Sequence, residues 1–235
     1  MTPTLVRQNP PHAGATPRVD LRARARDWSE IQERMLVPLY QAVYERLAVG
    51  PGTRLLGLGC GSGLALLMAA SRGAAVTGVD AGRAEHLALA RDRLLPRAWD
   101  TPAPGGARAP GAARIVEGSP REVRHTRVPA FGLVTAFDPI GCLAGDADGL
   151  VDLLAEATPL AERGAAVVLA GWGPPERCAT SSVLRVATEL ADPLRGPGSW
   201  RPALRDDLEE VARRVGLEPD GSGRVACPFG YADLD

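Results

Sequence analysis

Glycines at alternate positions in the segment 55–63 are the part of this sequence with the clearest chemical meaning. The segment reads Leu-Leu-Gly-Leu-Gly-Cys-Gly-Ser-Gly, and apolar residues resume with helical spacing at Leu64. An apolar strand, a glycine turn and a helix together bring backbone N–H groups and a helix N-terminus against a ligand. Glycine suits the turn, residues 59–63, because a β-carbon would block the ligand and because such turns need positive φ angles.

An acidic residue follows at the spacing that a nucleoside site requires. The segment 75–80, Ala-Val-Thr-Gly-Val-Asp, predicts a second strand that ends in Asp80. An acid about 20 residues after the glycine turn commonly binds ribose hydroxyls. The Gly-Lys-Ser/Thr of a P-loop is absent, and Leu64 stands where a dinucleotide fingerprint has its third glycine. The two features predict a nucleoside ligand and leave its identity open.

With these motifs the sequence resembles the class I S-adenosylmethionine-dependent methyltransferases, in particular an actinobacterial branch that acts on small molecules. That branch reads L-L-D-x-G-C-G-x-G at the turn and V-x-G-x-D at the second strand, which correspond to residues 55–63 and 76–80. Residues 131–138, 172–176 and 227–235 also resemble the family. The resemblance implies a Rossmann-like, doubly wound α/β sheet that is mostly parallel, S-adenosylmethionine as cofactor, and a small-molecule substrate of secondary metabolism.

The sequence departs from the family where the family has acids: Gly57, Ser119 and Gly132 replace them. The resemblance implies that the acid at position 57 holds the methionine ammonium of the cofactor. Loss of one charged hydrogen bond weakens binding about tenfold to a hundredfold. Two alternatives therefore stay open beside methyl transfer. The fold could serve another reaction, such as cyclisation, rearrangement or hydrolysis, or the chain could be a non-catalytic partner subunit.

Composition sets wider limits. The 235 residues suit one α/β domain, and a net charge of −1 with 45% hydrophobic residues indicates neither disorder nor a nucleic-acid-binding surface. The four cysteines are far apart, which favours reduced thiols and a cytoplasmic protein. We expect no secretion signal, no membrane span and no metal site, because no segment has the required apolar run or ligand spacing.

The chain divides into a flexible tail (1–20), an N-terminal helical lid (21–50) and an S-adenosylmethionine-binding domain (51–235) that contains a loop insertion (96–113). The first helix of this segment is expected to begin near Asp27, and Pro38 is expected to divide it into two helices or to kink it. Its apolar face is predicted to comprise Ile31, Met35, Leu39, Val43 and Leu47.

Further elements follow from apolar periodicity. Helices are predicted at 64–71, 83–94, 146–160, 181–190 and 204–215, and strands at 114–118, 131–138, 165–172 and 223–229. The strand at 165–172 is wholly apolar, which is typical of a central parallel strand. The family's last, antiparallel strand has no counterpart in this sequence. An open sheet edge would favour a homodimer.

Candidate site residues come from the motifs and from the resemblance. Asp138, at the predicted end of a strand, is the first candidate for a base that takes a proton from the acceptor, with His125 second. A turn or helix cap is an equally open interpretation of Asp138. The resemblance implies that Trp28 and Trp172 line the substrate pocket. It implies cofactor contacts from these residues: Gly57, Gly59, Cys60, Gly61, Gly63, Asp80, Ala81, Gly118, Ser119 and Phe137.

Overall fold

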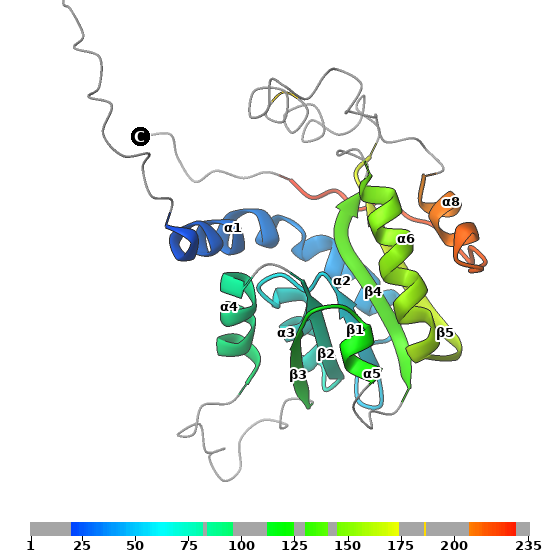
Figure 1. Ribbon diagram of the computed structural model, residues 1–235, viewed down its shortest axis with the longest axis horizontal. Coiled ribbons are helices and arrows are strands. Elements are labelled where there is room, and N and C mark those ends of the chain that lie inside the picture. The colour runs from blue at the N-terminus through cyan, green and yellow to red at the C-terminus, as the bar shows by residue number, and fades with distance from the viewer. Residues whose placement is uncertain are drawn as a thin grey trace, which may run out of the picture.

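Five parallel strands form a single sheet at the centre of the molecule (Figure 1). The computed structural model describes residues 20–81, 84–95, 112–124, 130–140, 145–173, 186 and 207–228. The strand order is β3-β2-β1-β4-β5, so the direction of winding reverses between β1 and β4. This confirms the predicted α/β fold. The strands are β1 (Arg54–Leu58), β2 (Ala75–Asp80), β3 (Ala113–Glu117), β4 (Phe131–Ile140) and β5 (Ala161–Gly171).

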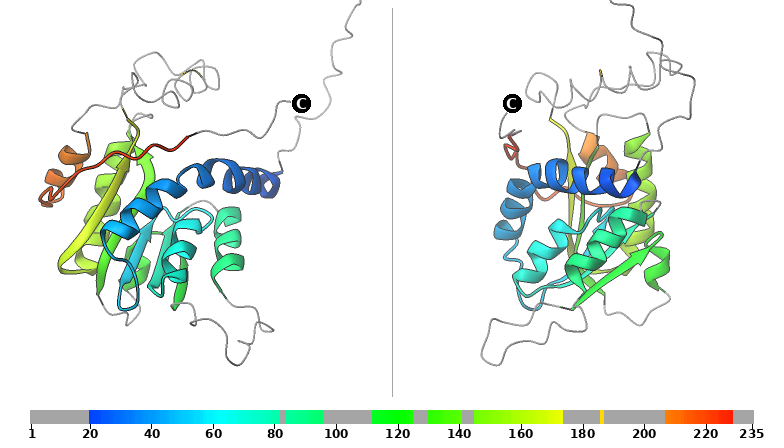
Figure 2. Two further views of the ribbon diagram at one scale, coloured as in Figure 1. Left: turned by 180° about the vertical axis from the view of Figure 1, so that it is seen from behind. Right: turned by 90° about the vertical axis from the view of Figure 1, so that its left-hand side faces the viewer.

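Helices cover both faces of this sheet, as the views in Figure 2 show. One face carries α2 (Val37–Arg46), α3 (Leu64–Ser71) and α4 (Ala84–Leu94). The other carries α5 (Arg121–Arg124), α6 (Asp146–Ala157) and α8 (Asp207–Arg214), and a 3-10 turn, η1 (Thr158–Leu160), follows α6. The first helix, α1 (Leu21–Met35), lies against α4, α3 and α2. The sheet is therefore doubly wound, as predicted.

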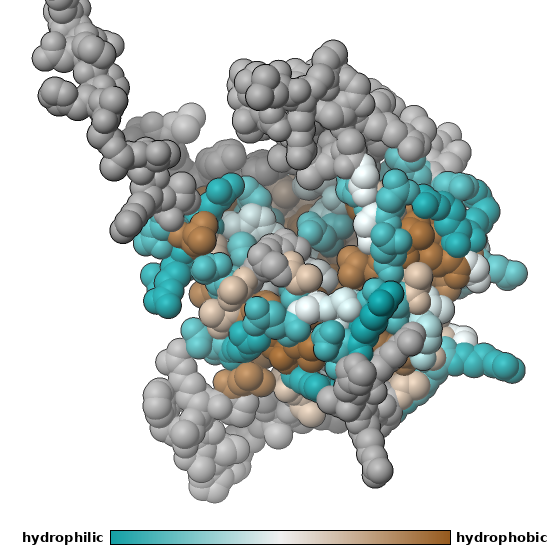
Figure 3. Space-filling view, in the orientation of Figure 1, coloured by the Kyte–Doolittle hydropathy of each residue, from teal (hydrophilic) through white to brown (hydrophobic). Residues whose placement is uncertain are grey.

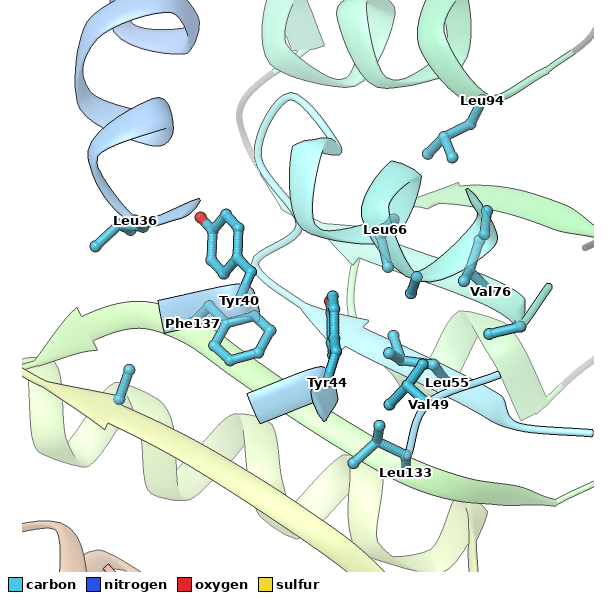
Figure 4. Close-up of a cluster of buried hydrophobic side chains, with 14 residues drawn as sticks. Leu36, Tyr40, Tyr44, Val49, Leu55, Leu66, Val76, Leu94, Leu133 and Phe137 are labelled. Carbon is cyan, nitrogen blue, oxygen red and sulfur yellow. The ribbon is translucent and has the colours of Figure 1, made fainter. Parts of the chain in front are cut away.

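Alternation of side chains along the strands builds two separate cores. Leu55 and Phe137 point to the side of α2 and α3, where Phe137 contacts Tyr40 and Tyr44 (Figure 4). Leu56 points to the opposite face, towards α6. Leu55, Leu133 and Phe137 thus face α2 and α3, whereas Phe131, at the start of β4, belongs to the opposite core.

The N-terminal helices differ from the expectation in two respects. Helix α1 begins at Leu21, not near Asp27, because the Asp20 carboxylate accepts hydrogen bonds from the backbone N–H groups of residues 22 and 23 at 2.9 and 3.1 Å. The predicted apolar face is wrong at both ends, since Ile31 and Leu47 are exposed. The predicted division into two helices is confirmed, but the break lies at Leu36 and Pro38 belongs to the first turn of α2.

The strands also differ from the predicted ones. Strand β4 continues to Ile140, so Asp138 lies within it and not at its end. Strand β5 begins at Ala161, four residues before the predicted start, and passes through a left-handed Gly164. It lies at the edge of the described sheet, so the expectation of a central strand is wrong. Residues 217–228 contain no strand, which contradicts the start of the predicted sixth strand within the described range.

Some expectations fall outside the described residues. These are the tail before residue 20, His125, most of the insertion at 96–113 and nearly all of the helix predicted at 181–190. In the part that is described, no helix has the length and apolar character needed to cross a membrane. The face drawn in Figure 3 mixes hydrophilic and hydrophobic residues over the described elements.

Candidate nucleoside-binding site

The glycine turn connects β1 to α3 in a conformation that only glycine adopts readily. Gly59, Gly61 and Gly63 have φ angles of 59°, 54° and 80°, all in the left-handed region. The N–H of Cys60 donates to the carbonyl of Val79 at 3.1 Å, which holds the turn beside the end of β2. The expectation of positive φ angles is confirmed.

Asp80 lies directly against this turn. Its side chain is buried, and its Oδ2 accepts a hydrogen bond from the N–H of Gly61 at 3.0 Å. The Asp80 carbonyl accepts another from the N–H of Gly118 at 2.9 Å, which joins the ends of β2 and β3. The structure thus brings together the two motifs from which a nucleoside ligand was predicted, at the carboxyl ends of the strands.

Helix α1 lies over the glycine turn and brings Trp28 to it. A β-carbon on Gly61 would be only 2.9 Å from Cη2 of Trp28. The other side of the Trp28 ring packs edge-on against His86 of α4, with ring centroids 4.9 Å apart. Trp28 is therefore a wall of the site, while its contact with a substrate stays a proposal.

A buried polar network fastens α1 to the turn, and sequence reasoning missed it. Glu33 accepts hydrogen bonds from the N–H of Leu64 at 3.1 Å and from the hydroxyl of Ser62, and it pairs with Arg93 at 2.9 Å. Arg93 also donates to Ser29 and to the Ser62 carbonyl. The available signal was the spacing of Ser29 and Glu33, which places both on one helix face.

A small cavity lies where α1, α2, the turn and β4 meet. Its volume is about 30 Å³, and its walls include Trp28, Glu33, Tyr40, Gly59 and Asp138. Sites for cofactors usually measure about 300–1,000 Å³. Side chains of α1, among them Trp28 and Glu33, therefore occupy part of the space above the turn.

Tyr40 adds a phenol to this cavity. Burial raises the pKa of Tyr40 above its ordinary value, and the nearby carboxylates of Glu33 and Asp138 raise it further. The phenol therefore stays protonated at neutral pH and can donate a hydrogen bond. Asp138 reaches the cavity from a bulge, because the pairing of β4 with β5 shifts register between Ala136 and Ile140.

Gly57 has a crowded surrounding on the side where a β-carbon would project. Gly57 belongs to β1, and a β-carbon on it would lie 2.8 Å from Cδ2 of Leu66. Leu66 also approaches Gly78, where an added β-carbon would be 2.5 Å from its Cδ1. The Leu66 side chain thus fills the space into which an acid at position 57 would project.

The remaining predicted residues lie farther from the cavity. Ser119 accepts a hydrogen bond from the N–H of Arg121 at 3.2 Å and so caps α5. Ala81 is exposed after β2, and Trp172 is anchored after β5 through its N–H to the Ile140 carbonyl at 2.8 Å. Trp172 is not among the residues that line the cavity. Within the described ranges, no three His, Cys, Asp or Glu side chains gather as metal ligands would.

Comparisons with known proteins bear on the fold alone. No protein-family model matches the sequence, and no curated protein sequence matches it. A solved structure of an S-adenosylmethionine-dependent methyltransferase from Methanosarcina mazei is similar, with a TM-score of 0.51, 16% identity, and coverage of 73% of this chain and 82% of that one.

Two further structures are less similar. The magnesium protoporphyrin IX methyltransferase of Synechocystis, solved with S-adenosylhomocysteine, gives a TM-score of 0.49 at 16% identity and covers 79% and 76% of the two chains. A methyltransferase of Geobacter sulfurreducens gives 0.37 at 18% identity, and the match spans 55% of this chain and only 46% of that protein. On the likeness to the Methanosarcina mazei structure, this chain has the fold of the class I S-adenosylmethionine-dependent methyltransferases.

Proposed function

We propose that this protein is an S-adenosylmethionine-dependent methyltransferase that acts on a small molecule. The observation that carries the proposal is the hydrogen bond between Asp80 and the N–H of Gly61. It sets a buried carboxylate beside three left-handed glycines at the switch point of a parallel sheet. Ligands of open α/β sheets bind at such a point.

The residues around the turn fit an adenosyl group. Asp80 would bind the ribose hydroxyls, and Gly59 and Gly61 would allow the ligand to approach the backbone, since neither has a β-carbon. Phe137 and Trp28 supply aromatic surface in the adjoining cavity, which Gly59 also lines. When bound, the cofactor supplies an electrophilic methyl group on a sulfonium.

Asp138 is the proposed proton acceptor for the incoming nucleophile. Its backbone lies in the β4 bulge and it lines the cavity beside Tyr40. Methyl transfer depends mainly on orientation and desolvation, so a base assists the reaction without being required for it. His125 is kept as a second proposed base, and Trp172 as a more distant wall of the substrate pocket.

Calorimetric titration with S-adenosylhomocysteine tests the proposal. We expect micromolar binding by the full chain and a loss of at least tenfold in Asp80→Ala. Asp152→Ala, an exposed acid on α6, is the matched control and should bind as the native chain does. Absence of binding in the native chain would overturn the proposal.

A non-methylating reaction on the same fold is the second candidate. The glycine at position 57, with Leu66 packed beside it, favours this candidate, because the charge expected there to hold the cofactor is absent. Binding of S-adenosylhomocysteine without methyl release to any acceptor screened would support this candidate. A non-catalytic partner subunit would instead bind neither S-adenosylhomocysteine nor an acceptor.

The setting of the activity is also proposed. A cytoplasmic enzyme of actinobacterial secondary metabolism agrees with the sequence resemblance and with the spread of the cysteines. A homodimer would cover the β5 edge, at which the described residues place no further strand.

A further inference from the structure

Glu33 is the most deeply buried acid that lines the cavity, and it comes from the lid. Its side chain is 3% exposed. Its Oε2 faces Arg93 and Ser62, whereas its Oε1 accepts one hydrogen bond, from the N–H of Leu64 at 3.1 Å, among the described residues. A carboxylate oxygen has two lone pairs, so Oε1 keeps acceptor capacity.

The direction of that oxygen matters. A β-carbon on Gly61 would lie 3.6 Å from Oε1, so this oxygen faces the backbone of the glycine turn. Glu33 of α1 and Gly57 of β1 line the same cavity. The carboxylate therefore lies at the cavity that position 57 also lines.

Position 57 carries no acid, and Leu66 crowds the space beside it. The cavity is also lined by the rings of Tyr40 and Phe137, whose faces attract cations. A carboxylate and aromatic rings around one small space suit an ammonium group.

We propose that Glu33 is the specificity-determining residue that binds the ammonium of the cofactor's amino-acid end, in place of an acid in the strand before the turn. The inference rests on the proposed function. It makes recognition of that end depend on closure of α1, because the acid travels with the lid.

Two ligands separate this role from a structural one. S-adenosylhomocysteine carries the amino-acid end, and 5′-methylthioadenosine lacks it. In Glu33→Gln we expect the affinity for S-adenosylhomocysteine to fall about tenfold to a hundredfold, the usual effect of losing a charged hydrogen bond. The affinity for 5′-methylthioadenosine should change less than about twofold, since its contacts are with Asp80 and the turn.

Glu30→Gln is the matched control, because Glu30 is an exposed acid on the same helix. It should leave both affinities unchanged. Equal losses for both ligands in Glu33→Gln would overturn the inference, since they would report only a damaged lid. Unchanged binding of S-adenosylhomocysteine would overturn it too.

A measurement on the native chain covers the case in which Glu33→Gln does not fold. An S-adenosylhomocysteine analogue that lacks only the α-amino group should bind at least about tenfold more weakly than S-adenosylhomocysteine itself. Equal binding of the two would reject the inference. Failure of the native chain to bind any adenosyl ligand would instead reject the proposed function.

Discussion

Trp28 and Gly61 are in contact so close that position 61 has no room for a side chain. A β-carbon there would lie 2.9 Å from Cη2 and 3.1 Å from Cζ3 of the Trp28 ring. The contact joins α1 to the turn after β1, two segments separated in sequence by α2 and β1. The glycine thus serves the packing of the lid as well as the shape of the turn.

Gly61→Ala should therefore destabilise the protein in two ways. The substitution strains a left-handed backbone and pushes against Trp28, which together should lower the free energy of unfolding by about 2–4 kcal/mol. Gly52→Ala is the control, because Gly52 is also left-handed but has no atom within 4 Å of an added β-carbon. Urea denaturation should show the smaller loss for Gly52→Ala. Equal losses would mean that Trp28 yields freely.

Arg93→Met should be costly because it leaves Glu33 charged and buried without its cation. Removal of one partner of a buried ion pair typically lowers the free energy of unfolding by about 3–5 kcal/mol. Adding Glu33→Gln to Arg93→Met should recover part of that loss. Arg91→Met is the control, because Arg91 pairs with Glu117 at 3.5 Å on the exposed surface. A similar loss in Arg91→Met and Arg93→Met would contradict the prediction.

Sequence reasoning located the glycine turn, Asp80 and the doubly wound sheet, because strand, turn and helix signals there are local. It also placed α3 at residues 64–71, as the structure has it. The buried face of α4, which includes Leu87 and Ala90, followed from apolar spacing.

The buried face of α1 was misjudged because it includes the polar residues Ser29 and Glu33 beside Ala25. Apolar periodicity assigned Ile31 to the core, but Ser29 and Glu33 are buried instead. Their partners, Ser62 and Arg93, lie on other elements, so the spacing of Ser29 and Glu33 on one helix face does not by itself reveal the network. Buried polar groups are satisfied by tertiary contacts, which periodicity does not encode. Tyr40 was missed for the same reason.

Tyr40 should make the protein sensitive to alkaline pH. An unfolded tyrosine ionises near 10.0, whereas burial and the neighbouring carboxylates raise the pKa of folded Tyr40. The stability that this difference contributes is present below pH 10 and is lost as the pH rises from 10 towards the folded value. The slope is about 1.4 kcal/mol per pH unit.

Tyr40→Phe removes this titration. Its melting temperature should fall less between pH 9 and pH 11 than that of the native chain. Tyr44 is the internal comparison, because burial also raises the pKa of its phenol, which donates to the Ala65 carbonyl at 2.9 Å. The variant with both substitutions should show the flattest profile. Identical profiles for all proteins would refute the assignment.

Gly57→Asp should not restore a cofactor contact by itself. The new side chain would meet Leu66, so we expect a loss of about 1–3 kcal/mol in the free energy of unfolding. Leu66→Ala alone should cost about 2–5 kcal/mol, because it leaves a cavity. The double variant should lose less than the sum, and four urea titrations measure this coupling. Strict additivity would show that Leu66 does not exclude the acid.

We predict that helix α1 moves to admit an adenosyl ligand, since Trp28 of α1 packs on the glycine turn and the adjoining cavity measures only about 30 Å³. The break at Leu36 separates α1 from α2, whose Tyr40 and Tyr44 are buried in the core. Without ligand, amide hydrogen exchange should be faster in residues 21–35 than in residues 37–46. Addition of S-adenosylhomocysteine should slow exchange in 21–35 only.

Arg93→Met supplies the independent check on this motion. It breaks the attachment of Glu33 to α4, so exchange in residues 21–35 should rise further without ligand, while residues 37–46 stay unchanged. Arg91→Met again serves as the control, because its ion pair with Glu117 does not involve α1. Exchange in 21–35 that is as slow as in 37–46, and insensitive to both ligand and Arg93→Met, would show that α1 is a fixed part of the fold. In that case α1 would leave no room for the cofactor above the turn, and the methyltransferase proposal would be rejected.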